Sequence, residues 1–248
     1  MLRNKSTSNI FQRLSKWRVN ESLRFSEESM FQAQLCFLDT IGCIIIGSRE
    51  QVTKKVACSI HRDYVRLSQK NELELSASGS ALINGTAAHA IDFDDYEAPA
   101  STHPSSSIIP ALFALSMKKD VSYKTMLESY LVGFESIIRI GQTLGGYEHY
   151  LRGWHSTATV GVFGAAAATA HLLNLSENKT TMALNICCSM SAGLKIQFGT
   201  DTKAIHAGFA ARAGVEAAIL ADNGATASLS ALDGNSGFLD QYSGRHNN

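Results

Sequence analysis

The chain has 248 residues, of which 45% are hydrophobic and 18% are charged, so it carries enough apolar side chain to build one sizeable core. Lysine plus arginine and aspartate plus glutamate each total 22, and the formal net charge is zero. This balance gives no electrostatic reason to expect nucleic acid or an anionic membrane as a partner. Any attraction for anions must therefore come from a local grouping of cations.

The five cysteines do not form a recognisable framework. They occur at positions 36, 43, 58, 187 and 188, an odd number without C-x-x-C spacing. Such a pattern is not typical of a disulfide-stapled or zinc-binding protein, and free cysteine commonly behaves as a small core residue. The cysteine pattern favours a reducing compartment, and we expect a cytoplasmic protein.

The first twenty residues contain five basic side chains and no acid. One interpretation is a transit peptide, which would place the protein in mitochondria if the source is eukaryotic. The other is an ordinary first helix, because Ile10, Phe11, Leu14 and Trp17 form an apolar stripe at helical spacing. The stripe favours the helix.

The next segment shows start, face and stop signals of a helix. Ser26 is a suitable N-cap, Glu27 and Glu28 follow it in the first turn, and the apolar run ends at Gly47. The three prolines all lie between positions 99 and 110, so elsewhere long helices are permitted. Helical patterns continue at 51–67, 78–93, 105–118, 122–144, 157–174, 177–194 and 203–222. We predict an all-α fold in one domain spanning residues 1–248.

Two features of the predicted helices concern their surroundings. Residues 153–176 carry no charged side chain, but they are dominated by alanine and glycine and include polar residues, which favours a buried helix over a membrane span. Small residues also gather at 161–168 and 207–214. Glycine in a helix costs about 1 kcal/mol relative to alanine, and it usually allows close backbone approach. These stretches predict tight helix packing, either inside the core or at a dimer interface.

Basic side chains coincide with three predicted helix starts. His103 precedes Pro104, His155 precedes the capping residue Ser156, and Lys203 follows Thr202. Helix N-termini present free N–H groups and a partial positive charge, so they bind carboxylate or phosphate. A lone histidine at such a position is more commonly a capping or surface residue. If the three starts converge, they predict a pocket for an acid with several carboxylates.

A run of acids, Asp92, Asp94 and Asp95, is predicted at the end of the helix that contains His89. Acids are electrostatically disfavoured at a helix C-terminus, so the run calls for an explanation. It could be a solvated turn, a metal site, or an acid–base pair with His103. The sequence lacks H-x-x-x-H, H-E-x-x-H, G-x-S-x-G, G-x-G-x-x-G and Walker A patterns. We therefore predict neither a metal nor a cofactor.

Five strings carry a resemblance to a known family. They are LDTIGCIIIG at 38–47, NGTAAHAIDFDD at 84–95, THPS at 102–105, GWHSTATVG at 153–161 and DTKAIHAGFAARAG at 201–214. Together, in this order and spacing, they resemble the MmgE/PrpD family over about residues 7–242. That family includes 2-methylcitrate dehydratase, cis-aconitate decarboxylase and an iminodisuccinate epimerase.

The resemblance implies a metal-free lyase or isomerase with a mainly helical domain that forms a homodimer, and a smaller α/β lid domain. It maps the catalytic residues onto Asp92, His103, His155 and Lys203. Lys203 and His155, together with Ser156 and Thr202, would bind a small polycarboxylate substrate. His103 and His155 would move protons beside a carboxylate, and Asp92 would orient a histidine.

The sequence departs from the family pattern in two places. Tyr96 and Glu97 follow the acidic run where the decarboxylase branch has threonine. The lid domain is also absent from the 248 residues, so we expect either that a separate lid-domain polypeptide completes the pocket or that activity is reduced. The alternative is a catalytically inactive homologue that serves as a dimerisation or protein-binding module.

Overall fold

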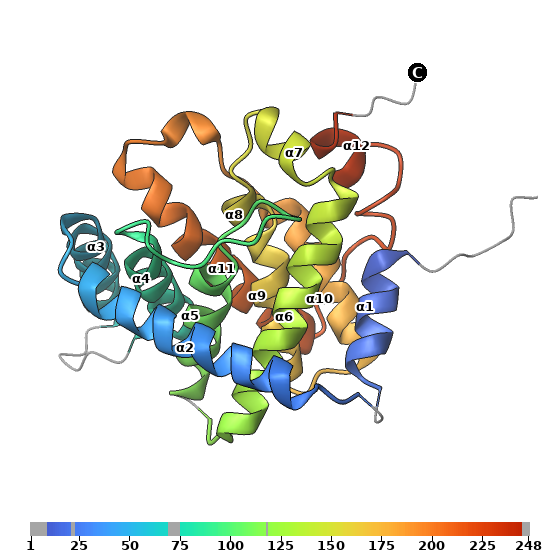
Figure 1. Ribbon diagram of the computed structural model, residues 1–248, viewed down its shortest axis with the longest axis horizontal. Coiled ribbons are helices and arrows are strands. Elements are labelled where there is room, and N and C mark those ends of the chain that lie inside the picture. Colours follow the sequence, from blue (N-terminus) through green and yellow to red (C-terminus); the bar gives the residue numbers. More distant parts are fainter. Residues whose placement is uncertain (1–8, 21–22, 69–74, 118, 245–248) are drawn as a thin grey trace, which may run out of the picture.

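The structure is a computed structural model that describes residues 9–20, 23–68, 75–117 and 119–244. These residues fold into α-helices and one 3-10 turn, with two isolated β-bridges and no strand, as the predicted all-α class requires (Figure 1). In chain order the helices are α1 (Ile10–Arg18), α2 (Glu27–Gly47), α3 (Gln51–Ser68), α4 (Ala77–His89), α5 (Ser105–Ser116), α6 (Tyr123–Thr143), α7 (Tyr147–Leu151), α8 (Ser156–Thr159), α9 (Gly161–Leu172), α10 (Glu177–Met190), α11 (Asp201–Asp222) and α12 (Phe238–Tyr242).

Most predicted helices are found, and the differences have local causes. The side chain of Ser26 accepts a hydrogen bond from the Ser29 amide and so begins α2 as predicted. The helix predicted at 157–174 is instead divided into α8 and α9 at Val160, whose φ of −105° departs from helical values. Helix α4 ends at His89, so the acids after it lie in a loop and not, as predicted, at the end of the helix. Helices α7 and α12 are too short for periodicity to reveal.

Small residues hold the centre of the bundle together. Helix α11 packs against α4, α9, α10 and α5. A Cβ added at Gly208 would lie 2.4 Å from the carbonyl oxygen of Leu82 on α4, and one added at Gly214 would lie 2.4 Å from the Ala165 Cβ on α9. These glycines therefore allow backbone contact within the core, which is one of the two roles that the sequence left open.

The first helix packs onto the same core. Asn9 and Gln12 form a reciprocal capping box at its start. Phe11 and Leu14 are buried, and the Phe11 ring lies 5.4 Å from that of Phe163. The predicted first helix is therefore confirmed. Residues 1–8, on which part of the transit-peptide interpretation rests, lie outside the described residues.

Within the part of the chain that the structure describes, two helices are long and apolar enough to cross a membrane by length and composition, which is weak evidence on its own. In α11, 61% of the apolar window is buried inside the protein, as in a core helix. In α2 only 28% is buried. Residues 153–176, for which the sequence predicts a buried helix, contain the helices α8 and α9, whose residues are almost all buried.

Two other histidines, the buried His149 and the partly buried His171, are held in neutral form. Burial lowers the pKa of His149 to about 4, although its hydrogen bond with the Tyr242 carbonyl opposes the shift. Burial and the nearby charge of Arg18 lower the pKa of His171 to about 4. Asp95 shifts in the other direction: burial raises its pKa to about 6, against the two hydrogen bonds that it accepts from Ser105 at the start of α5.

The contact between α4 and α11 can be tested with Gly208→Ala. The added methyl must displace the α4 backbone, so we expect a loss of about 1–3 kcal/mol in the free energy of unfolding, measured by urea denaturation. Gly42→Ala in α2 is the matched control, because a Cβ there meets nothing within 4 Å. The control should be neutral or stabilising by up to about 1 kcal/mol. Equal effects of the two substitutions would contradict the packing model.

The buried histidines predict how stability depends on pH. Between pH 6.5 and about 4 the unfolded chain protonates His149 and His171 while the native chain does not, so the free energy of unfolding should rise with pH across this window. Asp95 acts in the opposite direction. Its carboxyl stays protonated in the native state up to about pH 6, which by itself would make the free energy of unfolding fall as pH rises. Urea denaturation at several pH values measures the slope, and His171→Gln should reduce it. A stability that falls with rising pH here would disprove the prediction.

Candidate functional site

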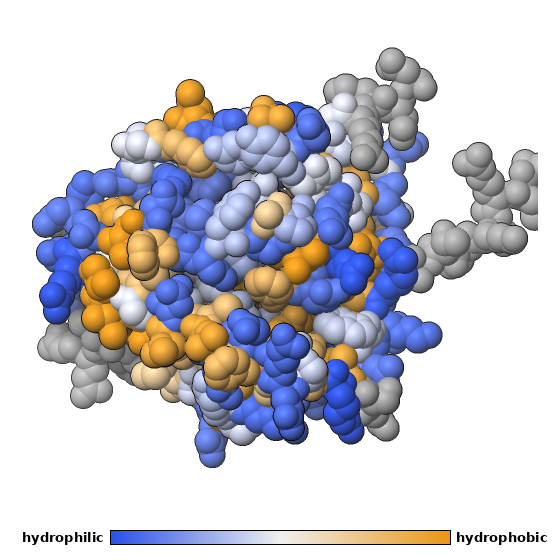
Figure 2. Space-filling model, in the orientation of Figure 1, coloured by the Kyte–Doolittle hydropathy of each residue, from blue (hydrophilic) through white to orange (hydrophobic). Residues whose placement is uncertain are grey.

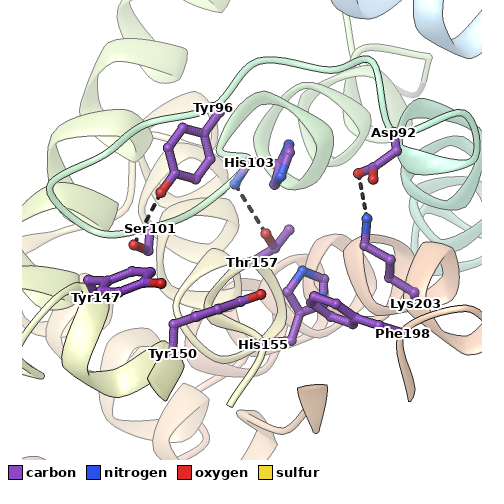
Figure 3. A pocket seen from close by; sticks show the side chains of 10 residues that line it. All are labelled: Asp92, Tyr96, Ser101, His103, Tyr147, Tyr150, His155, Thr157, Phe198 and Lys203. Atoms are coloured by element: carbon purple, nitrogen blue, oxygen red, sulfur yellow. Dashed lines mark hydrogen bonds and ion pairs between the residues drawn. The ribbon is translucent and has the colours of Figure 1, made fainter. Parts of the chain in front are cut away.

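One hollow of about 410 Å³ collects the residues that the sequence singled out. Its walls come from the loop between α4 and α5, from α7, from the start of α8, and from the segment that leads into α11 (Figure 3). The lining residues are Asp92, Tyr96, Ser101, His103, Tyr147, Tyr150, His155, Thr157, Phe198 and Lys203. All four predicted catalytic residues thus line a single cavity, of a size ordinary for small-molecule sites.

The other two predicted binding residues do not line it. Thr202 lies on the first turn of α11, and Ser156 is fully buried with no hydrogen-bond partner for its hydroxyl among the described residues. Thr157 takes the expected place of Ser156, and its hydroxyl accepts a hydrogen bond of 3.1 Å from the amide of His103. Successive side chains of a helical turn point about 100° apart, so a one-residue difference decides which of them faces the hollow.

Asp92 and Lys203 form an ion pair across the hollow. The Lys203 Nζ lies 2.5 Å from Asp92 Oδ1, and Figure 3 shows the two side chains pointing toward each other. Burial alone would raise the pKa of Asp92, but the hydrogen bond and the charge of Lys203 outweigh it and lower the pKa. We predicted that Asp92 orients a histidine. The structure corrects this, because the carboxylate that contacts the histidines belongs to Asp94.

Asp94 holds two imidazole rings. Both of its carboxylate oxygens lie 2.9 Å from His89 Nδ1, and both side chains are inaccessible to solvent. His103 Nδ1 lies 3.3 Å from the Asp94 carbonyl oxygen and 3.5 Å from its carboxylate. Since every partner of these nitrogens is an acceptor, each Nδ1 carries the hydrogen. His103 Nε2 is therefore a free lone pair.

The backbone around His155 is fixed by a short antiparallel pairing. The amide of His155 donates to the Gly193 carbonyl at 3.0 Å, and Trp154 and Leu194 form a β-bridge. The ring of His155 stacks on that of His89, with centroids 5.6 Å apart and an interplanar angle of 26°. Burial, and then the charges of His89, His206 and Lys203, lower the pKa of His155 to about 2. Burial also lowers the pKa of His103, partly opposed by Asp94. Both rings are neutral near pH 7.

Aromatic rings form the rest of the wall, and we did not predict them from the sequence. Tyr147 and Tyr150 stack at 5.6 Å on α7, and the ammonium of Lys195 lies 4.2 Å above the Tyr150 ring. The ring of Phe198 contacts His155 edge-on. The spacing Tyr-x-x-Tyr just before the string GWHSTATVG was the one available signal, since it places two rings on one helical face beside a candidate histidine.

One group of described residues brings potential metal donors together. Ligand atoms of His89, Asp92, Asp94 and His103 all lie within 4.8 Å of one another. The donor set does not suit a cation. The ammonium of Lys203 already neutralises the Asp92 carboxylate and would repel a cation, and His89 and His103 already engage the Asp94 carboxylate. We assign this cluster to hydrogen bonding among its own members.

The arrangement suits proton transfer next to an anion. Lys203 is the one fully charged cation among the lining residues, and it would attract a carboxylate. The neutral rings of His103 and His155 stand beside it and can accept or donate a proton. Aromatic and hydroxyl groups complete the wall and lower the exposure of the charges to water.

Comparison with known proteins identifies the family of this chain. Residues 12–248 match the model of the MmgE/PrpD N-terminal domain. The chain is 33% identical over 224 residues to the cis-aconitate decarboxylase-like protein oryM of Aspergillus oryzae, an alignment that covers 85% of this chain and 46% of that protein. It is 31% identical over 229 residues to the cis-aconitate decarboxylase of Aspergillus terreus, with coverage of 85% and 45%, and 32% identical over 214 residues to that of Homo sapiens, with coverage of 81% and 43%.

The chain spans about half the length of these relatives. The family match covers nearly all of the chain and includes every residue of the hollow. The chain therefore belongs to the MmgE/PrpD family, and residues 12–248 correspond to the N-terminal domain of that family.

Proposed function

We propose that this chain contributes the catalytic hollow of a metal-free lyase, a dehydratase or decarboxylase, that acts on a small polycarboxylate. The observation that carries the proposal is the grouping of Asp92, His103, His155 and Lys203 around one hollow of about 410 Å³. A citrate-sized acid fits this volume, and at neutral pH it offers several carboxylates to a site with one fixed cation.

The proposed chemistry begins with charge. A substrate carboxylate binds Lys203 and shares its ammonium with Asp92, which lies on the exposed side of the pair with 57% of its side chain accessible. The bound carboxylate then places its neighbouring carbon near the histidines. Negative charge that develops on this carbon and carboxylate in the transition state is stabilised by Lys203.

The histidines move the proton. His103 Nε2 is a free lone pair and can accept a proton from the carbon beside the carboxylate. The imidazolium that forms is stabilised by the Asp94 carboxylate at 3.5 Å. For elimination, a second group must protonate the leaving hydroxyl, and for decarboxylation it must protonate the carbon. His155, which also lines the hollow, would take this role.

Tyr96 bears on which reaction of the family this hollow could support. The relatives are named cis-aconitate decarboxylases, but Tyr96 enters the wall of this hollow, with its hydroxyl 3.3 Å from that of Ser101, and it would change the shape available to substrate. Two alternatives to a lyase have support of their own. Histidines on two walls also suit an isomerase or epimerase of the family, which needs proton transfer on two faces of one carbon. The other alternative is an inactive homologue that binds proteins, and the exposed apolar side chains of α2, such as that of Leu38, favour it.

Lys203→Met tests the proposed binding of a carboxylate. Loss of a charge-assisted hydrogen bond should weaken binding of cis-aconitate, 2-methylcitrate or iminodisuccinate about 10- to 100-fold, measured by calorimetry on the chain alone and with a family lid domain added in trans. Lys55→Met is the control, since Lys55 is 66% exposed and pairs with Asp201 outside the hollow. Unchanged affinity in Lys203→Met, or no binding of any of these acids by the wild type, would rule out the proposal.

We also propose a homodimer that forms through the helical domain. Its support is an apolar face on α2, visible as a band of hydrophobic residues in Figure 2 and made of Phe31, Leu35, Leu38, Ile41, Ile45 and Ile46, each at least 38% exposed. Contiguous apolar patches of this kind commonly mark interfaces. The family resemblance favours a second copy of the chain as the partner.

Leu38→Glu tests this interface, because Leu38 is 69% exposed and its replacement should leave the fold intact. A charge at the centre of a buried face should convert the dimer to a monomer, as measured by light scattering after size exclusion. Met117→Glu, at an 83% exposed position beyond α5, is the matched control. A monomeric wild type, or a variant that remains dimeric, would count against the dimer.

A further inference from the structure

A fourth histidine lies behind the hollow and takes no part in the proposal above. His206 sits in the second turn of α11 and is 5% exposed. Its Nδ1 lies 2.9 Å from the Nδ1 of His155, and the two ring centroids are 5.2 Å apart. The contact engages Nδ1 of His155, so only Nε2 of that ring is left for the substrate.

Two Nδ1 atoms at this distance must share one hydrogen. Each neutral imidazole carries a single N–H, so one Nδ1 donates and the other accepts. If His206 donates, His155 holds its hydrogen on Nε2 and presents an acid. If His155 donates, its Nε2 is a bare lone pair and presents a base. The state of His206 therefore fixes which role His155 can play.

The pair also joins two separate hollows. His155 lines the candidate site and His206 does not. His206 lines a second hollow of about 430 Å³, whose wall includes Gly193, Phe209 and the ion pair of Arg212 with Glu216, and which does not include His155. A Cβ on Gly193 would meet the Ala158 Cβ at 2.4 Å and the His206 ring at 3.7 Å, so glycine is needed where this backbone passes the pair.

We propose that His206 is the positioning residue of His155, which sets the nitrogen that carries its hydrogen and connects it to water in the second hollow. This inference rests on the proposed function for its catalytic part. The pairing of the two rings does not depend on it.

The proton balance closes over the pair. His155 Nε2–H transfers its proton to the substrate, the Nδ1 hydrogen of His206 passes to His155 Nδ1, and His206 Nε2 takes a proton from water in the second hollow. The hydroxide left there takes a proton back from His206 Nε2 in the reverse sequence. Both rings remain neutral before and after the step. The reverse sequence restores the first state when His155 next accepts a proton in the candidate site. No other co-reactant is needed.

Two variants separate positioning from proton transfer. His206→Phe keeps a ring but removes the Nδ1 partner, whereas in His206→Asn an amide can still hydrogen-bond His155 but cannot relay a proton. Imidazole nitrogen NMR of the 248-residue chain should show one of the two histidines with hydrogen on Nδ1. The His155 nitrogen shifts should change in His206→Phe and stay close to wild type in His206→Asn.

Kinetics with the turned-over acid then test the relay, with the lid domain added if turnover requires it. Both variants should lower kcat about 100-fold, with KM within a factor of about two. His171→Asn, which removes a partly buried imidazole that lines neither hollow, should change neither kcat nor the His155 shifts.

The outcomes separate the two proposals. Unchanged His155 shifts in His206→Phe would overturn the inference, whatever the activity. Unchanged kcat in both variants would overturn the relay. If the wild type turns over none of the acids while the shared hydrogen is observed, the proposed function fails with the relay, and the positioning of His155 by His206 stands.

Discussion

The whole site depends on the close contact between α4 and α11. Gly85 and Gly208 allow the two backbones to approach so nearly that a Cβ on either would overlap the other helix. The helices run in opposite directions at this contact. Asp92 lies seven residues after Gly85, and Lys203 lies five residues before Gly208. Their ion pair is therefore at the end of the same helix–helix interface. The separation of two backbones thus sets the position of the Lys203 charge.

Two neighbouring carboxylates divide the electrostatic work. Asp92 faces the lysine, and Asp94, two residues later and fully buried, faces the histidines. Asp92 has a left-handed backbone, with φ of +54°, and these two acids, close in sequence, contact different partners. The cation is therefore partly neutralised when no substrate is bound, and the imidazoles keep an acceptor that fixes their tautomers. Burial lowers the pKa of His103 and of His155, so these two rings are neutral near pH 7 and can exchange protons without first losing one.

Much of the fold follows from local patterns in the sequence. The helix at Ser26–Gly47 has a cap, acids in its first turn and a glycine stop, and the structure agrees because each signal acts within a few residues. The division at Val160 was missed because it depends on Gly161 fitting against Ser107 of α5, a contact that no local pattern contains. For the same reason the short helices α7 and α12, which depend on packing, could not be predicted.

The candidate site divides in the same way. Helix starts located His103, His155 and Lys203, and the structure places all three in one hollow. The exchange of roles between Asp92 and Asp94, and of places between Ser156 and Thr157, turns on rotation by a single residue. Periodicity cannot resolve that. His206 looked like one more residue on a small-residue helix, because its partner is 51 positions away.

The left-handed backbone at the site has a consequence for how such a domain could change over time. Four described residues other than glycine have positive φ, and two of them, Asp92 and Ser101, line the hollow. Such conformations cost on the order of 1 kcal/mol or more each. Glycine at position 92 would relieve that strain and remove the carboxylate that pairs with Lys203 in a single step. A lineage in which this carboxylate is not needed would thus gain folding stability by losing it.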